Sequence, residues 1–388
     1  MGLAAAFLLA GYEFMRSASQ SLFIGAYTSR QLPFAMMLAP VGTILALALY
    51  GRLLSAGGAR RAIFYTSLLA AAVMIGCHVA LTKGIRWAVV VLYVWRESYI
   101  VLLVEQIWSF LDSTIRRHDG ARLNGPICGL ASLGAIVGGM AVKHLAGVMG
   151  SANLVLGAAC SLLPMALLAM VAYHIGGEPR SSEKPCEHLG VRVLFRIPIL
   201  RRLAILIALT QVLSAVLDLQ LSVWVEKTLP LTDERTAWYG GFYAGLNTLS
   251  AVFQFVVTPL LLAFVALRGI HLGIPLVHLV LAIFAFAYPS LAAAAAAYMA
   301  FKAVDYSTFR AAKELLYVPL TFDARYRAKE LIDAFTYRLA KGAVSALLAV
   351  FSRLGALPLF VYPALAVVMA LGWFPLALRI TDSEGKQS

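Results

Sequence analysis

Long apolar runs separated by short polar segments dominate the chain. A helix needs about 20 mostly apolar residues to cross the hydrocarbon core of a bilayer. Twelve runs meet this requirement, and the pattern therefore predicts an all-α membrane protein with twelve transmembrane helices. The expected spans are Gly2–Tyr27, Leu32–Leu54, Ala62–Leu81, Trp87–Leu111, Leu123–Leu145, Leu154–Ile175, Leu203–Val225, Trp238–Leu267, Leu272–Tyr288, Leu291–Tyr317, Leu331–Phe351 and Leu357–Leu378.

The longest polar connector, Gly176–Arg202, divides these spans into six and six. It predicts an N-terminal half (1–176), a linker (177–202) and a C-terminal half (203–388). Charged positions repeat between the halves, since Arg16 precedes Asp218, and Glu97 precedes Lys302, by nearly the same number of residues. Two pseudo-symmetric six-helix halves describe the major facilitator fold, which holds its solute between them.

Composition supports the membrane assignment. Hydrophobic residues make up 61% of the 388 positions and charged residues 13%, against about 25% charged in soluble domains. The net charge of +13 comes largely from basic residues in short loops, a placement that indicates membrane orientation rather than nucleic-acid binding. The bilayer is therefore the expected surrounding, and no nucleic-acid partner is predicted. The four cysteines show no metal-binding spacing, and no metal site is expected.

Charged side chains inside apolar spans are the main functional signal, because they are costly there and normally face a cavity or a partner. In the first span Glu13, Arg16 and Gln20 follow steps of three and four residues, which place them on one helical face. Asp218 lies on a similar polar stripe in the seventh span. The two stripes are predicted to line one solute path.

Further charges occur in the fourth, tenth and eleventh spans. The predicted solute-binding residues are Arg16, Gln20, Glu97, Asp218, Lys302, Asp305, Arg338 and Lys341. The predicted gating or ion-pair residues are Glu13, Glu105, Arg310, Glu314 and Asp333. Glu97 is expected to point away from its neighbour Arg96, because adjacent helical residues do not face each other. An ion pair between Glu97 and Lys302, at equivalent positions of the two halves, is a hypothesis that follows.

The segment YSTFRAAKELLYVPL followed by RYRAKELIDAFTYRLAKG resembles the nucleotide transporter (ATP/ADP translocase) family. The residues that match the family pattern there are Tyr306, Ser307, Phe309, Lys313, Glu314, Tyr317, Pro319, Leu320, Lys329, Ile332, Asp333, Arg338 and Lys341. Glu97, Trp108 and Ala121-Arg122 add to the resemblance, as does Arg16 in the first span. It covers all spans loosely and is specific in the fourth, tenth and eleventh.

Departures from the family pattern are informative. Ser19 and Gln20 stand where the family has a Lys and an Asp, and Arg310 stands where it has an Asp. The resemblance therefore implies a bacterial, facilitator-like branch in the inner (plasma) membrane rather than strict ATP/ADP exchange. No GxxxxGK[ST] motif is present, so ATP hydrolysis is not indicated. We expect no enzyme activity and no cofactor.

The sequence predicts a monomeric secondary transporter that works by alternating access on a small anionic solute, such as a nucleotide. One alternative is a proton-coupled exporter of a drug or metabolite, with Glu97, Asp218 or Asp305 carrying the proton. A second alternative, from another class, is a lipid-handling or receptor-like membrane protein without solute turnover.

Loop charges predict the orientation. Lysines and arginines are concentrated in alternate loops, including Arg60 and Arg61 and the connector Gly176–Arg202. The positive-inside rule then places both termini and this connector in the cytoplasm. In a variant that keeps only Cys186, an impermeant thiol reagent should label inverted vesicles and leave intact cells unlabelled. Labelling of intact cells would reverse the orientation.

Overall fold

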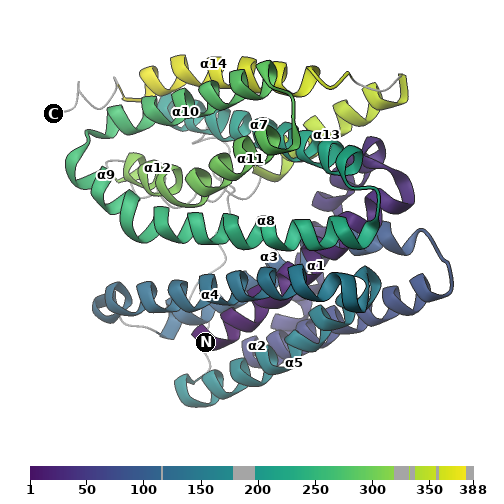
Figure 1. Ribbon diagram of the computed structural model, residues 1–388. Coiled ribbons are helices and arrows are strands. Elements are labelled where there is room, and N and C mark those ends of the chain that lie inside the picture. The colour runs from purple at the N-terminus through teal and green to yellow at the C-terminus, as the bar shows by residue number, and fades with distance from the viewer. Residues whose placement is uncertain (115–116, 178–196, 319–331, 333–336, 355–357, 382–388) are drawn as a thin grey trace. The chain divides into compact units, whose positions relative to one another are not determined.

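The computed structural model describes residues 1–114, 117–177, 197–318, 332, 337–354 and 358–381. All regular secondary structure in this part of the chain is helical, as the sequence predicts (Figure 1). In chain order the elements are α1 (Gly2–Tyr27), η1 (Ser29–Gln31), α2 (Leu32–Thr82), α3 (Ala88–Thr114), α4 (Arg117–Met149), α5 (Ser151–Gly176), α7 (Pro198–Thr228), α8 (Thr232–Val252), η2 (Phe253–Val257), α9 (Thr258–Phe264), α10 (Leu267–Ala287), α11 (Leu291–Val304), η3 (Asp305–Phe309), α12 (Arg310–Tyr317), α13 (Tyr337–Leu354) and α14 (Val361–Thr381).

Seven helices of the described part are long and apolar enough to cross a membrane, and the count of twelve stays a prediction. The 51-residue α2 contains both the second and the third expected spans. Gly58, with φ 75° and ψ 173°, interrupts its helical geometry. The loop expected between these spans is therefore helical apart from this residue. A single glycine can redirect the chain here, because it has no Cβ and therefore adopts a positive φ without a steric clash.

Two expected spans are interrupted by five-residue π-helices. In the eighth span η2 separates α8 from α9, and in the tenth span η3 separates α11 from α12. The elements η2 and η3 contact each other, and the hydroxyl oxygen of Thr308 in η3 lies 2.8 Å from that of Thr258, which directly follows η2. Asp305, a predicted solute residue, is the first residue of η3. Such π-bulges occur frequently at functional sites.

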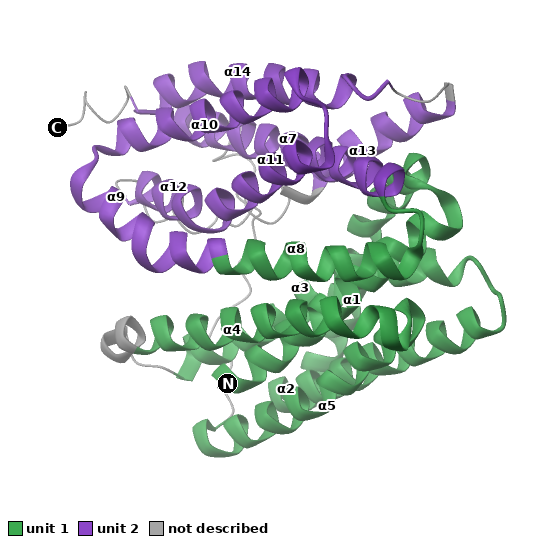
Figure 2. Ribbon diagram, viewed as in Figure 1, with its two compact units in different colours: residues 1–183, 229–248 green, residues 184–228, 249–388 purple. Residues whose placement is uncertain are grey.

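The chain forms two compact units (Figure 2). Unit 1 comprises Met1–Glu183 and Leu229–Thr248, and unit 2 comprises Lys184–Thr228 and Leu249–Ser388. Most of α8 thus belongs to the same unit as the N-terminal helices. The expected division into 1–176, 177–202 and 203–388 stays a prediction, and residues 178–196 of the linker lie outside the described part.

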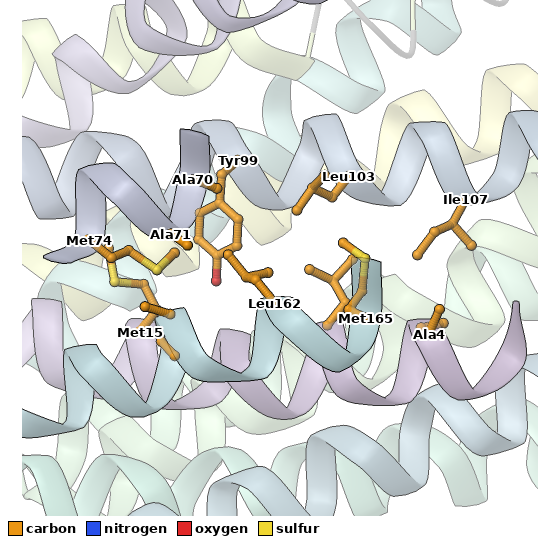
Figure 3. Close-up of a cluster of buried hydrophobic side chains, with 14 of the residues drawn as sticks. Ala4, Met15, Ala70, Ala71, Met74, Tyr99, Leu103, Ile107, Leu162 and Met165 are labelled. Atoms are coloured by element: carbon orange, nitrogen blue, oxygen red, sulfur yellow. The ribbon is translucent and has the colours of Figure 1, made fainter. Parts of the chain in front are cut away.

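The core of unit 1 is a continuous apolar cluster between α1, α2, α3 and α5 (Figure 3). Met15 of α1, Tyr99 of α3 and Met165 of α5 are among its fully buried members. Helix α1 packs along both α4 and α5. It therefore has apolar contacts on several sides, and its polar positions are held within a packed bundle.

Glycines allow helices of unit 1 to approach backbone to backbone. A Cβ on Gly134 of α4 would lie 2.2 Å from the carbonyl oxygen of Ala6 in α1. A Cβ on Gly139 of α4 would lie 2.8 Å from the carbonyl oxygen of Gly240 in α8. Small residues at such crossings permit close van der Waals contact between membrane helices, which fixes α1 and α8 against α4.

Asp233 adds a polar contact between α8 and α5. Its carboxylate accepts hydrogen bonds from the backbone N–H of Ser151 at 2.7 Å and from the Ser151 hydroxyl. The Ser151 hydroxyl also lies 2.7 Å from that of Thr236. A carboxylate beside the first turn of α5 is favoured by the helix dipole. The start of α8 is therefore anchored on the start of α5.

In unit 2, α14 packs along both α7 and α10, and α11 and α13 also contact α7. The buried ring of His278 lies between Phe301 and Trp373, with ring centroids 5.2 and 5.6 Å away. Sequence reasoning did not include this histidine in the solute path, and its surroundings are those of a packing residue.

The close contact of α4 with α1 predicts a selective effect of added volume. Gly134→Ala should lower the melting temperature of the purified protein, because overpacking at a tight contact costs about 1–3 kcal/mol. Gly129→Ala, on the same helix, is the matched control, since its Cβ would meet no atom within 4 Å. It should be neutral or stabilising, because Ala favours helix over Gly by about 1 kcal/mol. Equal melting temperatures for both variants would contradict the contact.

Candidate functional site

The polar stripe of the first span lies inside unit 1. Glu13, Arg16 and Gln20 are all buried, with 2%, 8% and 0% of their surface exposed. The three- and four-residue spacing thus places them on one side of α1, and neighbouring helices cover that side. Buried charges are costly unless they are compensated. The contacts of each side chain therefore decide which charges are compensated by the protein and which could bind a solute.

Arg16 is stacked on tyrosine rings. Its guanidinium carbon lies 3.6 Å from the ring centroid of Tyr243 in α8 and 5.8 Å from that of Tyr12 in α1. A cation over an aromatic face is attracted by the ring quadrupole, worth about 2 kcal/mol when desolvated. Helix α8 therefore supplies the surface on which Arg16 is held.

Arg96 of α3 is a second buried arginine, 3% exposed. Its guanidinium carbon lies 3.9 Å from the ring centroid of Tyr93. One terminal nitrogen, Nη1, donates to the backbone carbonyl of Arg16 at 3.2 Å and to the hydroxyl of Ser19 at 3.3 Å. Arg96 thereby connects α3 to the polar face of α1, directly beside Arg16.

Glu97 pairs with its sequence neighbour. The Arg96 Nε lies 3.3 Å from the Glu97 Oε1, so the expectation that these side chains point apart is wrong. The flexible stem of arginine lets its head reach round the helix even though the Cβ atoms diverge. Because Glu97 has this partner and Lys302 belongs to unit 2, the ion pair between Glu97 and Lys302 stays a prediction.

Glu13 is held by a residue that sequence reasoning missed. The amide nitrogen of Asn247 in α8 donates to the Glu13 Oε1 at 2.8 Å. The second carboxylate oxygen, Oε2, is buried and accepts no hydrogen bond from the described residues. Asn247 gave a weak signal in the sequence as an uncharged polar residue within an apolar span.

Three further predicted residues lie on α3, α7 and α11. In unit 1, Glu105 is exposed on α3. In unit 2, Asp218 of α7 is buried, and the hydroxyl of Ser222 donates to its backbone carbonyl at 2.8 Å. Lys302 of α11 is 5% exposed, and its ammonium lies 5.2 Å from the ring centroid of Tyr306.

The remaining predicted residues follow Lys302 along the chain. Asp305, Glu314 and Lys341 are partly buried, and Arg310 is exposed. Asp333 and the side chain of Arg338 lie outside the described residues. Among the described residues, no group of three or more His, Cys, Asp or Glu side chains is arranged to hold a metal ion.

The side chains with the most explicit mutual contacts lie in unit 1. Two buried arginines, two glutamates and several tyrosines come together from α1, α3 and α8. We call Tyr12, Glu13, Arg16, Tyr93, Arg96, Glu97, Tyr243 and Asn247 the unit 1 polar cluster. It offers planar cationic donors, aromatic faces and one buried carboxylate, which suit reversible binding of a small polar solute.

No protein-family model matches this chain, and no curated protein matches it. Solved structures do share its fold. A bacterial homologue of the iron transporter ferroportin, in an inward-facing state, has a TM-score of 0.69 at 14% identity, over 97% of this chain and 98% of that one. The nucleoside transporter NupG has a TM-score of 0.67 at 13% identity, over 98% and 99%, and a mutant of it has 0.68.

These likenesses show the fold. The chain shares the fold of these proteins over nearly their whole length, and by their descriptions they are membrane transporters or homologues of one. The division into two six-helix halves of the major facilitator type stays a prediction. The resemblance to the nucleotide transporter family is not supported by a family match and stays a prediction.

The contacts of Arg96 predict a stability effect. Arg96→Lys should lower the melting temperature, because an ammonium cannot reproduce the planar donors that reach Arg16, Ser19 and Glu97. Each lost bond to a charged group is worth about 1.5–3 kcal/mol. Arg86→Lys is the matched control, because Arg86 is exposed. An unchanged melting temperature for Arg96→Lys would show that these bonds do not stabilise the bundle.

Proposed function

We propose that the protein is a secondary membrane transporter that works by alternating access and binds a small anionic solute at the unit 1 polar cluster. The observation that carries this proposal is the presence of two buried arginines in neighbouring apolar helices, Arg16 in α1 and Arg96 in α3, linked by a 3.2 Å hydrogen bond. No covalent chemistry and no cofactor are part of the proposal.

The stacking of each guanidinium favours anion recognition. A guanidinium lying face-on to a tyrosine ring, as Arg16 does on Tyr243, keeps its N–H donors in its own plane. That plane matches the paired oxygens of a carboxylate or phosphate, which arginine binds in bidentate fashion. Lysine presents only a point charge. The choice of arginine at both buried positions therefore fits a planar or phosphorylated anion.

The fold supports transport but does not select the solute. NupG is a nucleoside transporter, whereas the ferroportin homologue is related to an iron transporter. Because proteins with one fold transport different solutes, the specificity for a solute depends on individual residues of the binding site. Tyr12, a partly buried tyrosine of the cluster, offers a ring on which a nucleobase can stack. Together with the resemblance of the tenth and eleventh spans, this ring makes a nucleotide the first solute to test.

The proposal also includes the predicted residues of unit 2, which would form a second part of the solute path. Lys302 is a buried cation surrounded by aromatic rings, and Asp218 is a buried acid on α7. Asp305 begins a π-helical segment, and Lys341 is partly buried on α13. A monomer in the inner membrane of a bacterium, with both termini cytoplasmic, completes the proposal.

Counterflow in proteoliposomes tests the function. Radiolabelled adenosine monophosphate should enter vesicles preloaded with the unlabelled compound, and Arg16→Lys should lose most of this exchange. The loss follows from replacing a bidentate donor by a point charge. Arg353→Lys, at an exposed position on α13, is the control and should exchange as wild type does. Normal exchange by Arg16→Lys would remove Arg16 from the site.

The same assay separates the alternatives. Uridine and a panel of organic anions, added as competitors, rank the solute classes. Transport that requires a pH gradient and is insensitive to all nucleotides would favour a proton-coupled exporter of another compound. Absence of counterflow with every compound, from protein shown to be folded, would favour a lipid-handling or receptor-like role.

A further inference from the structure

Glu13 is a carboxyl group in unusual surroundings. It is 2% exposed in the middle of α1, one oxygen accepts a hydrogen bond from Asn247, and the other oxygen is buried with no donor among the described residues. An ionised carboxylate normally receives several hydrogen bonds when it is buried, because its desolvation is costly. One neutral amide is a small compensation for a full negative charge.

The groups around Glu13 come from α1, α3 and α8. Arg16, one helical turn further along α1, acts electrostatically on Glu13. From α3 the hydroxyl-bearing ring of Tyr99 lies within electrostatic range, and from α8 the neighbour is the Asn247 amide. Arg16 therefore supplies a positive charge beside this carboxyl.

The other helices that pack on this part of α1 contribute small or apolar groups. Ser161 of α5 lies against Gly11, and Gly157 of α5 faces Phe14. Gly138 of α4 faces Ala10, and α2 contributes apolar side chains to the core around Met15 (Figure 3). Helices α2, α4 and α5 therefore place small or apolar groups against this part of α1.

Charge balance in the cluster links Glu13 to the solute. With Glu13 ionised, two arginines face two glutamates, and the unit 1 polar cluster is neutral. Glu97 is paired with Arg96 at 3.3 Å, and Arg16 acts on Glu13 from one helical turn away. An anion bound by Arg16 adds a negative charge that the cluster does not compensate. A proton on Glu13 restores neutrality.

We propose that Glu13 is a proton-binding site coupled to anion binding at Arg16, so that solute and proton occupy the cluster together. This inference rests on the proposed function and names its coupling ion. The proton comes from water on the side where the anion binds, forms the O–H bond of the Glu13 carboxylic acid, and returns to water on the side where the anion leaves. By thermodynamic reciprocity, protonation of Glu13 strengthens anion binding as much as the anion strengthens protonation.

Infrared difference spectroscopy of the full-length protein in nanodiscs tests the proton site without any solute. Spectra between about pH 5 and about pH 9 should contain a carboxylic-acid C=O band that Glu13→Gln lacks. Glu234→Gln, an exposed glutamate on α8, is the matched control and should keep the band. Glu13→Asp retains a carboxyl group and should shift the band, which covers the case in which Glu13→Gln fails to fold.

Proteoliposomes test the coupling. An inward proton gradient should make wild type accumulate radiolabelled adenosine monophosphate, whereas Glu13→Gln should exchange it without accumulation. Spectra of Glu13→Gln and Glu13→Asp that match wild type, or accumulation by Glu13→Gln at the wild-type level, would overturn the proposal. If the Glu13 band is present but no protein moves the probe, the proton site is supported and the proposed solute is what fails.

Discussion

The compensation of buried charge within apolar helices is the constraint on which the candidate site depends. Arg16 and Arg96 are almost completely buried, and the protein stabilises them in two ways. Tyrosine rings contact both guanidinium groups, and backbone, hydroxyl and carboxylate oxygens accept hydrogen bonds from Arg96. These contacts come from different helices, so satisfying the two charges also determines how α1, α3 and α8 pack.

Helix α1 combines this polar side with sides that make close apolar contacts. Gly134 and Gly138 of α4 bring the backbones of the two helices together, while Met15 enters the core shared with α3 and α5. The close packing fixes the rotation of α1 about its axis. It therefore keeps Glu13 and Arg16 in contact with α8, as the proposed binding site requires.

The shared fold gives the helix arrangement, whereas individual residues bear on which solute is bound. Likeness to transporters of different solutes at 13–14% identity indicates how the helices are arranged and leaves the cargo open. We propose that the cluster narrows the choice of cargo, because two buried arginines suit a negatively charged solute and the buried Glu13 carboxyl suits a proton. In unit 2 the π-helical segments η2 and η3 contact each other at Thr258 and Thr308, beside Asp305, and mark a second irregular region in the predicted path.

The sequence by itself determined the membrane class, the approximate helix positions and the common face of Glu13, Arg16 and Gln20, because apolar length and helical periodicity are local properties. Tertiary structure decided the partners. The amide of Asn247 and the ring of Tyr243 lie more than two hundred positions away from the residues they contact, and neither is charged, so a search for charges passes over them. The pairing of Arg96 with Glu97 also depended on the surroundings, since periodicity fixes where a Cβ points but not where a long side chain finds its counterion.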